Sequence, residues 1–400
     1  MASAGRKKRV APALLHKVEQ FNDDVNDAFI VPHEDAVVTA SDDKILRVWL
    51  LRESGEYWPS ICQNLSSSVS SLSYNGETRR LFVGLGSGAI TEFQLSEDFN
   101  RISLRRNYEA HLNRVTQMAF SLEHEWLLSV SRDKTFQWHS AESGLRIGGH
   151  RTEAWCMTVQ FDAESQHAFV GDYSGAIHVI KLEKRSLTIV TTLKGHSGSV
   201  RAMAWDHERR LLFSGSYDQT VIVWDIGSQK GTAFELNGHM APVCGLSYSQ
   251  HTRKLLSSGH DQKLVVWDMD ILRTETPSWK DSDTCELCKQ TFFWNVKEMW
   301  NRKKVDLNRQ HHCRKCGCAV CDKCSKNSTA LPKLGFEFPV RVCNDCYAKV
   351  TDADQRSTTM FFDMKHEVKL VYFDPTKGHL LTVGSDRVVK LWDVKGVMKE

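Results

Sequence analysis

The strongest constraint on the fold is a repeat of short apolar segments that end in tryptophan. Segments of this kind end at Trp49, Trp138, Trp224, Trp267 and Trp392. Phe93 and Ile180 fall at the same position of two further segments, so neighbouring ends lie 42 to 45 residues apart up to Trp267. A period of this size predicts seven copies of one supersecondary unit, because each copy buries its apolar face only against its neighbours.

Each unit is expected to contain short strands separated by turns. In the fifth unit Gly195-His196 is followed by the runs VRAMAW, LLFSGS and TVIVW, with Asp218 in the last turn. β-Branched and alternating runs of this length are typical of antiparallel strands. A unit with Gly-His near its start and Trp-Asp near its end resembles WD repeats. The resemblance implies an all-β fold, a seven-bladed WD-repeat β-propeller with about four strands in each blade.

The regular spacing is interrupted once, between Trp267 and Trp392. The extra length predicts a small second domain inserted between the sixth and seventh repeats. A ring of blades also leaves exposed strand edges unless its ends share a blade, so Leu14–Glu19 is expected to complete the seventh blade. We therefore expect three parts along the chain: repeats one to six with the closing strand in 1–274, the inserted domain in 275–352, and the seventh repeat in 353–400.

The inserted segment contains eight cysteines in four Cys-x-x-Cys pairs: Cys285/Cys288, Cys313/Cys316, Cys321/Cys324 and Cys343/Cys346. A two-residue gap lets both sulfurs of a pair reach one metal ion from a single tight turn. Four such pairs within about 60 residues predict two zinc ions, each held by four thiolates. The alternative is a set of four disulfides, which is typical of secreted proteins. Residues 1–30 lack the apolar core of a signal peptide, which favours zinc.

A basic run coincides with the second cysteine pair. Residues 309–316 contain three fixed positive charges and two imidazoles, with no acid among them. Guanidinium groups bind phosphate oxygens in pairs, and protonated imidazoles add charge-assisted hydrogen bonds. Two zinc ions with four thiolates each offset about four positive charges, fewer than the six between Arg302 and Lys315. The excess predicts a binding site for a phosphate monoester.

The sequence around these cysteines also resembles a known family. RQHHCRKCG at 309–317 resembles the R(R/K)HHCRxCG signature of FYVE zinc fingers, RVC at 341–343 resembles their RVC motif, and 279–281 resembles their WxxD motif. The resemblance implies binding of phosphatidylinositol 3-phosphate and a cross-braced fold. One zinc is then held by Cys285, Cys288, Cys321 and Cys324, and the other by Cys313, Cys316, Cys343 and Cys346. The implied headgroup site contains Arg309, Arg314 and Arg341 for phosphate, His311, and His312 with Asp281 or Asp283 for the inositol hydroxyls.

Three features depart from the FYVE pattern. Gln310 stands where the family has a second basic residue, and the acid follows Trp279 by two positions instead of three. Cys288 and Cys313 are separated by 24 residues, about twice the usual length in that family. The added segment is rich in aromatic residues, which either pack on the protein or enter the membrane. The candidates for membrane insertion are Val305, Leu307 and Trp300.

Composition and repetition argue against several other functions. A formal net charge of +3 is too small for a general nucleic-acid-binding surface, and no apolar run of about 18 residues is present to span a membrane. His196, Ser214 and Asp218 have the residue types of a catalytic triad, but equivalent sets recur in several repeats, whereas an active site needs one copy. We therefore expect no enzymatic activity.

Across its whole length the chain resembles the small proteins that combine WD repeats with a FYVE domain. This resemblance implies a cytoplasmic adaptor or scaffold, peripheral on early endosome membranes. It would bind phosphatidylinositol 3-phosphate through the zinc finger, and protein partners such as kinases or vesicle proteins through a propeller face. Two alternatives use the same cross-brace: a ubiquitin ligase and a histone-tail reader. The basic run favours an anionic lipid over a cationic tail.

Overall fold

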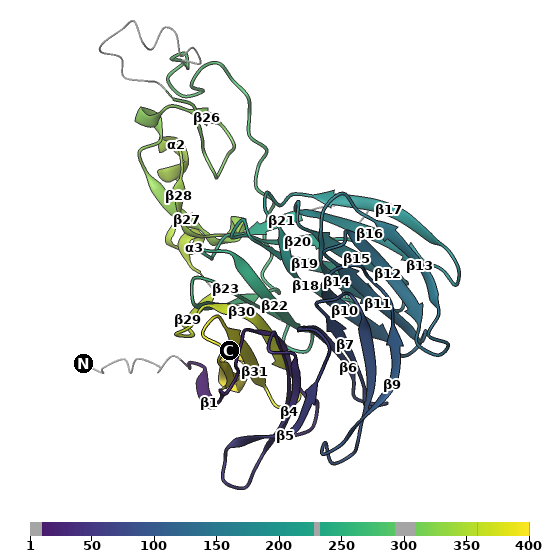
Figure 1. Cartoon of the computed structure of the whole chain (residues 1–400). Helices are drawn as coiled ribbons and strands as arrows, with labels where there is room; N and C mark the ends of the chain where they lie inside the picture. Colours follow the sequence, from purple (N-terminus) through teal and green to yellow (C-terminus); the bar gives the residue numbers. More distant parts are fainter. Residues whose placement is uncertain (1–9, 228–232, 293–308, 358, 400) are drawn as a thin grey trace, which may run out of the picture. The chain divides into compact units, whose positions relative to one another are not determined.

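The computed structural model describes residues 10–227, 233–292, 309–357 and 359–399 (Figure 1). The chain divides into two compact units. The first comprises Met1–Ile222, His239–Asp268 and Met360–Glu400, and the second comprises Val223–Gly238 and Met269–Thr359. The fold is a seven-bladed β-propeller, almost entirely β, with a small cysteine-rich domain inserted between the sixth and seventh sequence repeats, ahead of the last strand of blade 6. None of the helices in the described ranges has the length and apolar character needed to cross a bilayer.

Seven four-stranded antiparallel sheets form the blades. Blade 1 consists of β2 (Val25–Ile30), β3 (Ala36–Ser41), β4 (Ile45–Leu51) and β5 (Tyr57–Asn64). Blade 2 consists of β6 (Val69–Asn75), β7 (Arg80–Leu85), β8 (Ile90–Leu95) and β9 (Ile102–Tyr108). Blade 3 consists of β10 (Val115–Ser121), β11 (Trp126–Ser131), β12 (Thr135–Ser140) and β13 (Arg146–Arg151). Blade 4 consists of β14 (Cys156–Asp162), β15 (His167–Asp172), β16 (Ala176–Leu182) and β17 (Leu187–Lys194). Blade 5 consists of β18 (Val200–Asp206), β19 (Leu211–Ser216), β20 (Val221–Asp225) and β21 (Ala233–Leu236).

Segments far apart in the sequence complete the last two blades. Blade 6 consists of β22 (Val243–Ser249), β23 (Lys254–Gly259), β24 (Lys263–Asp268) and β29 (Met360–Asp363). Blade 7 consists of β30 (Val368–Asp374), β31 (His379–Gly384), β32 (Val389–Asp393) and β1 (Ala13–Val18), and is followed by the helix α4 (Lys395–Lys399). β1 is antiparallel to β32, so the N-terminal strand closes the ring as predicted (Figure 1). Closure removes the exposed edge that an open ring would have.

The repeated histidine, aspartate and serine form buried hydrogen-bond networks. In blade 5, His196 Nδ1 lies 2.9 Å from the Asp218 carboxylate and His196 Nε2 lies 2.7 Å from Ser214 Oγ. In blade 6, Trp267 Nε1 donates to Ser257 Oγ at 2.8 Å, and the same oxygen bonds to a buried histidine. Each network ties the loop before a blade to the turn between its second and third strands. The imidazoles therefore stabilise the blades, as expected from their recurrence.

The innermost strand of every blade contains a β-bulge after its first residue. The bulged residue has no partner in the neighbouring strand, and the bulge re-aims its side chain. We call these seven residues the bulge ring: Asn26, Ser70, Thr116, Met157, Arg201, Cys244 and Lys369. All seven line one central cavity of the propeller.

Blade 2 lacks the histidine network and contains a buried ion-pair cluster instead. Arg80 Nε lies 2.8 Å from Glu92 Oε1, and Arg80 Nη1 lies 2.7 Å from Glu125 Oε2 in the next blade. Tyr108 donates to the other oxygen of Glu92 at 2.7 Å. Arg80 and Glu92 are 5% and 1% exposed. The cluster joins blades 2 and 3 with all its charges paired.

Glu92→Gln is expected to lower the free energy of unfolding of the propeller by about 3 kcal/mol, because removing one partner leaves a buried charge with incomplete compensation. Denaturant unfolding followed by tryptophan fluorescence measures the change. Glu97→Gln is the matched control, since the Glu97 side chain is 92% exposed and lies 3.9 Å from Arg79. The control should change stability by less than about 0.5 kcal/mol. Equal losses in both variants would show that the buried cluster has no special role.

Candidate zinc and phosphate site

Short elements connected by turns make up the inserted finger. They are β25 (His311–His312), β26 (Ala319–Val320), η1 (Asp322–Cys324), β27 (Ser328–Leu331), η2 (Pro332–Leu334), β28 (Phe336–Arg341), α2 (Asn344–Tyr347) and α3 (Asp352–Gln355). β25 pairs with β26, and β27 pairs with β28, both antiparallel. Elements of two to six residues cannot build a large core by themselves. Their arrangement therefore depends on the cysteines between them.

The eight paired cysteines gather into two groups. One group contains Cys285, Cys288, Cys321 and Cys324, and the other contains Cys313, Cys316, Cys343 and Cys346. Within each group the sulfur atoms all lie within 4.8 Å of one another. The first and third pairs thus share one group and the second and fourth share the other, as the FYVE resemblance implies. Each group could hold one zinc ion.

Tight turns place the first two pairs. The backbone reverses after Cys288 at Lys289, whose φ is 60°, and after Cys316 at Gly317, whose φ is 75°. Lys289 N donates to Cys285 O, and Gly317 N donates to Cys313 O. A Cβ atom at Gly317 would lie 2.3 Å from the carbonyl oxygen of Ser278. Position 317 therefore requires glycine both for its left-handed φ and for the close approach of the Trp279 segment.

The electrostatics of the thiols favour a bound cation. Burial alone would raise the pKa of Cys285, but backbone N–H groups, including that of Cys321 at 3.4 Å, lower it to about 6. In the same group, burial and the neighbouring sulfurs raise the pKa of Cys324. Cys313 and Cys346 show the same contrast in the second group. Four thiolates this close repel one another, so an all-cysteine set fits tetrahedral zinc, which would brace the fold.

Trp279 contacts two of the predicted headgroup residues. Its ring is stacked on His312, with ring centroids 4.8 Å apart and an interplanar angle of 8°. The guanidinium of Arg314 lies 4.5 Å from the centroid of the Trp279 ring. His312 Nε2 lies 3.3 Å from Lys280 O, and Lys280 N donates to Gly317 O at 3.0 Å. The Trp279 segment is thereby fixed against the second cysteine turn, and it orients an imidazole and a guanidinium together.

Arg341 and His311 contact an acid that the sequence reasoning did not include. Arg341 Nη1 lies 2.7 Å from Asp322 Oδ1, and His311 Nε2 lies 3.9 Å from the same oxygen. The hydrogen bond from Arg341 lowers the pKa of Asp322. Burial and the nearby Arg341 lower the pKa of His311. Arg314 N donates to Arg341 O at 3.0 Å, so the two arginines come from adjacent backbone segments.

The remaining residues predicted for headgroup binding and membrane insertion have fewer contacts or lie outside the described residues. Arg309 and Asp281 are exposed, and neither forms an ion pair with any residue that the structure describes. Gln310 Nε2 lies 3.4 Å from Ser282 O, so this departure from the FYVE pattern contacts the segment that follows Trp279. The predicted membrane-inserting residues Trp300, Val305 and Leu307 lie outside the described residues.

Sequence reasoning missed Asp322 as a member of this cluster. Asp322 lies inside the third cysteine pair, 19 residues before Arg341. It approaches His311 because β25 pairs with β26 in a register that places His311 opposite Val320. A two-residue strand gives no readable periodicity, so this register is not visible in the sequence. The only signal was the position of an acid between two predicted zinc ligands.

Two protein families match separate parts of the chain. The FYVE zinc finger family matches residues 277–352. The family described as WD domain, G-beta repeat matches residues 102–139, 187–225, 230–268 and 364–393. The WD40 β-propeller domain of Doa1 has a similar structure, with a TM-score of 0.63 and 13% sequence identity over 97% of this chain and 98% of that one. This likeness supports the propeller fold.

Several relatives resemble the chain over nearly its full length. WD repeat and FYVE domain-containing protein 2 from Homo sapiens is 56% identical over 97% of this chain and 96% of its own. WD repeat and FYVE domain-containing protein 1 from Homo sapiens is 51% identical over 98% and 96%. Vacuolar protein sorting-associated protein 27 from Saccharomyces cerevisiae is 43% identical over 75 residues, 18% of this chain and 10% of its own. The chain therefore belongs to the family of WD repeat and FYVE domain-containing proteins.

Proposed function

We propose that this protein is a non-catalytic adaptor that binds phosphatidylinositol 3-phosphate in early endosome membranes through its zinc finger. Its propeller binds protein partners. The observation that carries the proposal is the cluster of His311, His312, Arg314 and Arg341 around two cysteine groups that fit zinc. These side chains can donate hydrogen bonds to the oxygens of a phosphate monoester and of neighbouring hydroxyl groups.

The geometry supports a phosphate ligand in two ways. The Trp279 ring holds the Arg314 guanidinium by a cation–π contact, which orients its planar donor fork before the ligand arrives. Arg341 already binds a carboxylate oxygen of Asp322 at 2.7 Å. A phosphate oxygen offers the same chemistry with more negative charge. The site is thus arranged for an anion whose oxygens reach two guanidinium groups.

Other features support a membrane-bound ligand. The yeast relative that matches 75 residues of this chain is named for vacuolar protein sorting. We propose that Trp300, Val305 and Leu307 insert into the bilayer, because they precede Arg309 closely in the sequence and aromatic and aliphatic side chains favour the membrane interface. Basic residues near an anionic surface add about 1 kcal/mol each. Together these contributions would hold the protein peripherally on the membrane.

The test is a vesicle panel in which equal fractions of each phosphoinositide isomer are compared by co-sedimentation of the full chain. We expect vesicles with the 3-phosphate to bind at least about 10-fold more tightly than those with the 4- or 5-phosphate, because guanidinium forks discriminate by geometry. Equal binding to every isomer would contradict the proposed specificity. Binding to none of them, with two zinc ions present, would contradict lipid binding altogether.

Asp322→Asn is expected to strengthen vesicle binding by about 3-fold. The exposed carboxylate competes with the lipid phosphate for Arg341 and repels it, and exposed ion pairs have small effects. Vesicle titration measures the change. Asp345→Asn is the control, because it removes the same charge. Asp345 is an exposed acid inside the fourth cysteine pair. Weaker binding by Asp322→Asn would mean that Asp322 positions Arg341 for the lipid.

A further inference from the structure

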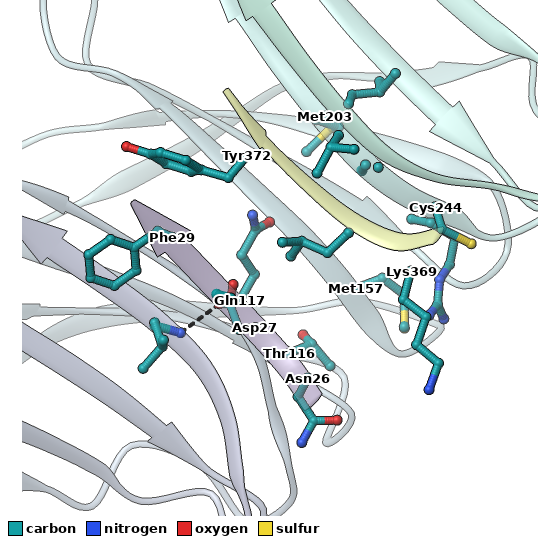
Figure 2. A pocket seen from close by; sticks show the side chains of 18 of the residues that line it. Asn26, Asp27, Phe29, Thr116, Gln117, Met157, Met203, Cys244, Lys369 and Tyr372 are labelled. Atoms are coloured by element: carbon teal, nitrogen blue, oxygen red, sulfur yellow. Dashed lines mark hydrogen bonds between the residues drawn. The ribbon is translucent and has the colours of Figure 1, made fainter. Parts of the chain in front are cut away.

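The propeller contains a central cavity of about 720 Å³ that the zinc finger does not explain (Figure 2). The innermost strands of all seven blades line it, and every member of the bulge ring contributes to its wall. Arg201 and Lys369 belong to that ring. Arg132 lies in the turn after β11, Arg114 lies in the loop before β10, and both also line the cavity. Four cationic side chains, two from blade 3 and one each from blades 5 and 7, therefore line the same cavity.

The charges at this cavity are not balanced. Arg114 lies 3.0 Å from Asp42 Oδ1, and Lys369 lies 2.8 Å from Asp24 Oδ2. Arg132 and Arg201 form no ion pair with any residue in the described parts of the chain. Burial lowers the pKa of Arg132, and the charges of Arg114 and Arg201 lower it further. The guanidinium groups thus repel one another, and the nearest acid acting on Arg132, Asp42, is already paired with Arg114.

Asp27 is the only acidic residue among the described residues that line the cavity. Its Oδ2 accepts a hydrogen bond from Leu72 N at 2.7 Å (Figure 2). Burial raises the pKa of Asp27 to about 7, so near neutral pH its carboxyl group is only partly ionised. It therefore offsets at most one of the four cations. The cavity keeps a net positive charge that an anionic ligand would complement.

Exposed aromatic side chains lie near Arg132 and in the wall of the cavity. The Arg132 guanidinium lies 5.7 Å from the ring centroid of Trp155, and Trp155 lies 5.2 Å from Tyr173. Tyr217 lines the cavity directly. These three rings are 43%, 55% and 52% exposed. Aromatic residues and arginines contribute most of the binding energy in many protein interfaces. A small inorganic anion would bind the arginines without contacting the aromatic rings.

We propose that this cavity mouth binds a phosphorylated peptide segment of a protein partner, with the phosphate held by Arg132 and Arg201 and apolar side chains resting on Trp155, Tyr173 and Tyr217. The proposal rests on the propeller being a protein-binding module and names the chemistry of its partner. One phosphate group matches two adjacent unpaired guanidinium groups. A long polyanion fits less well, because Asp24 and Asp42 lie beside the other two cations and would repel it.

The test uses the full chain and an immobilised library of short peptides with a fixed central phosphoserine or phosphothreonine, beside the same peptides without phosphate. The selected peptides are then titrated by fluorescence anisotropy. Arg132→Gln/Arg201→Gln is expected to weaken binding by at least about 10-fold, because two charge-assisted contacts are lost. Lys184→Gln/Arg185→Gln is the matched control: it removes the same charge from the exposed turn between β16 and β17. It should change affinity by less than about 2-fold.

Further measurements separate this proposal from lipid binding. Arg132→Gln/Arg201→Gln should bind vesicles containing phosphatidylinositol 3-phosphate as the wild type does, whereas Arg314→Ala should lose vesicle binding and keep peptide binding. Failure to select phosphorylated over unphosphorylated peptides would overturn the inference. So would displacement of the peptide by equimolar inorganic phosphate, which indicates a small-anion site, or tighter binding of a short single-stranded DNA that the double variant abolishes.

Discussion

Replacing Arg314 with alanine is expected to weaken binding to vesicles containing phosphatidylinositol 3-phosphate by about 30-fold, in line with the loss of a hydrogen bond to a charged group. Arg314 contributes a guanidinium that Trp279 orients at 4.5 Å. Its backbone N–H also donates to Arg341 O, and alanine keeps this bond. The substitution therefore removes the phosphate donor without removing the backbone contact. Co-sedimentation of the full chain with vesicles measures the loss.

Two variants control this experiment. Arg356→Ala removes the same charge from an exposed position after α3, and it should change affinity by less than about 2-fold. Arg314→Lys keeps the charge but loses the planar donor fork, so it should fall between wild type and alanine. Zinc content should remain at two ions per chain in every variant. Unchanged vesicle binding by Arg314→Ala with full zinc content would remove Arg314 from the headgroup site.

The propeller could be predicted because its signals are local and repeated. The spacing of five tryptophans, with Phe93 and Ile180 at the same position of the other two units, predicted seven repeats. The closing strand expected at Leu14–Glu19 is β1, Ala13–Val18. The second and fourth units have Phe93 and Ile180 at the position of the repeated tryptophan, and their blades contain other polar contacts. Blade 2 uses Arg80 and Glu92, and blade 4 uses a contact of 3.0 Å between His178 and Asp172, in place of the usual network. In both blades an acid and a basic side chain from neighbouring strands pair with each other.

The central cavity could not be predicted from the sequence. Arg132 comes from a turn and Arg201 from a bulge, and the two are 69 positions apart in the sequence. A bulge depends on the register between neighbouring strands, which periodicity does not specify. Ring closure then brings these side chains together. The sequence near Arg132 or Arg201 contains no pattern that predicts this long-range arrangement, whereas the spacing within each cysteine pair predicts a metal site directly.

In the zinc finger, sequence spacing predicted the ligands but did not by itself decide which pairs share a metal. That assignment came from the FYVE resemblance, and the two groups of sulfur atoms match it. The headgroup residues were also named by resemblance. The structure adds how they are held: His312 is stacked on Trp279, and Arg341 is paired with Asp322. These contacts depend on the fold of short segments that zinc braces, so they could not be read from residue types alone.

Removing zinc with a chelator is expected to abolish vesicle binding, with a loss of at least about 100-fold, and to unfold the finger while the propeller stays folded. Structural zinc contributes on the order of 10 kcal/mol to small domains of this kind. Apart from cysteines, the buried hydrophobic cluster of the finger contains only six members among the described residues: Phe292, Ala319, Val320, Leu331, Phe336 and Val342. That apolar surface is too small to hold the finger without metal. Limited proteolysis, zinc analysis and co-sedimentation measure the three effects.

Cysteine substitutions test the same point at single positions. Cys313→Ser removes a buried ligand and should release zinc from the second group, which disrupts β25 and the Arg314 turn and so abolishes vesicle binding. Cys318→Ser is the matched control, because Cys318 belongs to neither sulfur group and contributes a backbone carbonyl that accepts from Cys313 N. It should keep two zinc ions and full vesicle binding. If Cys313→Ser bound vesicles like Cys318→Ser, the cross-brace would not be what positions the phosphate donors.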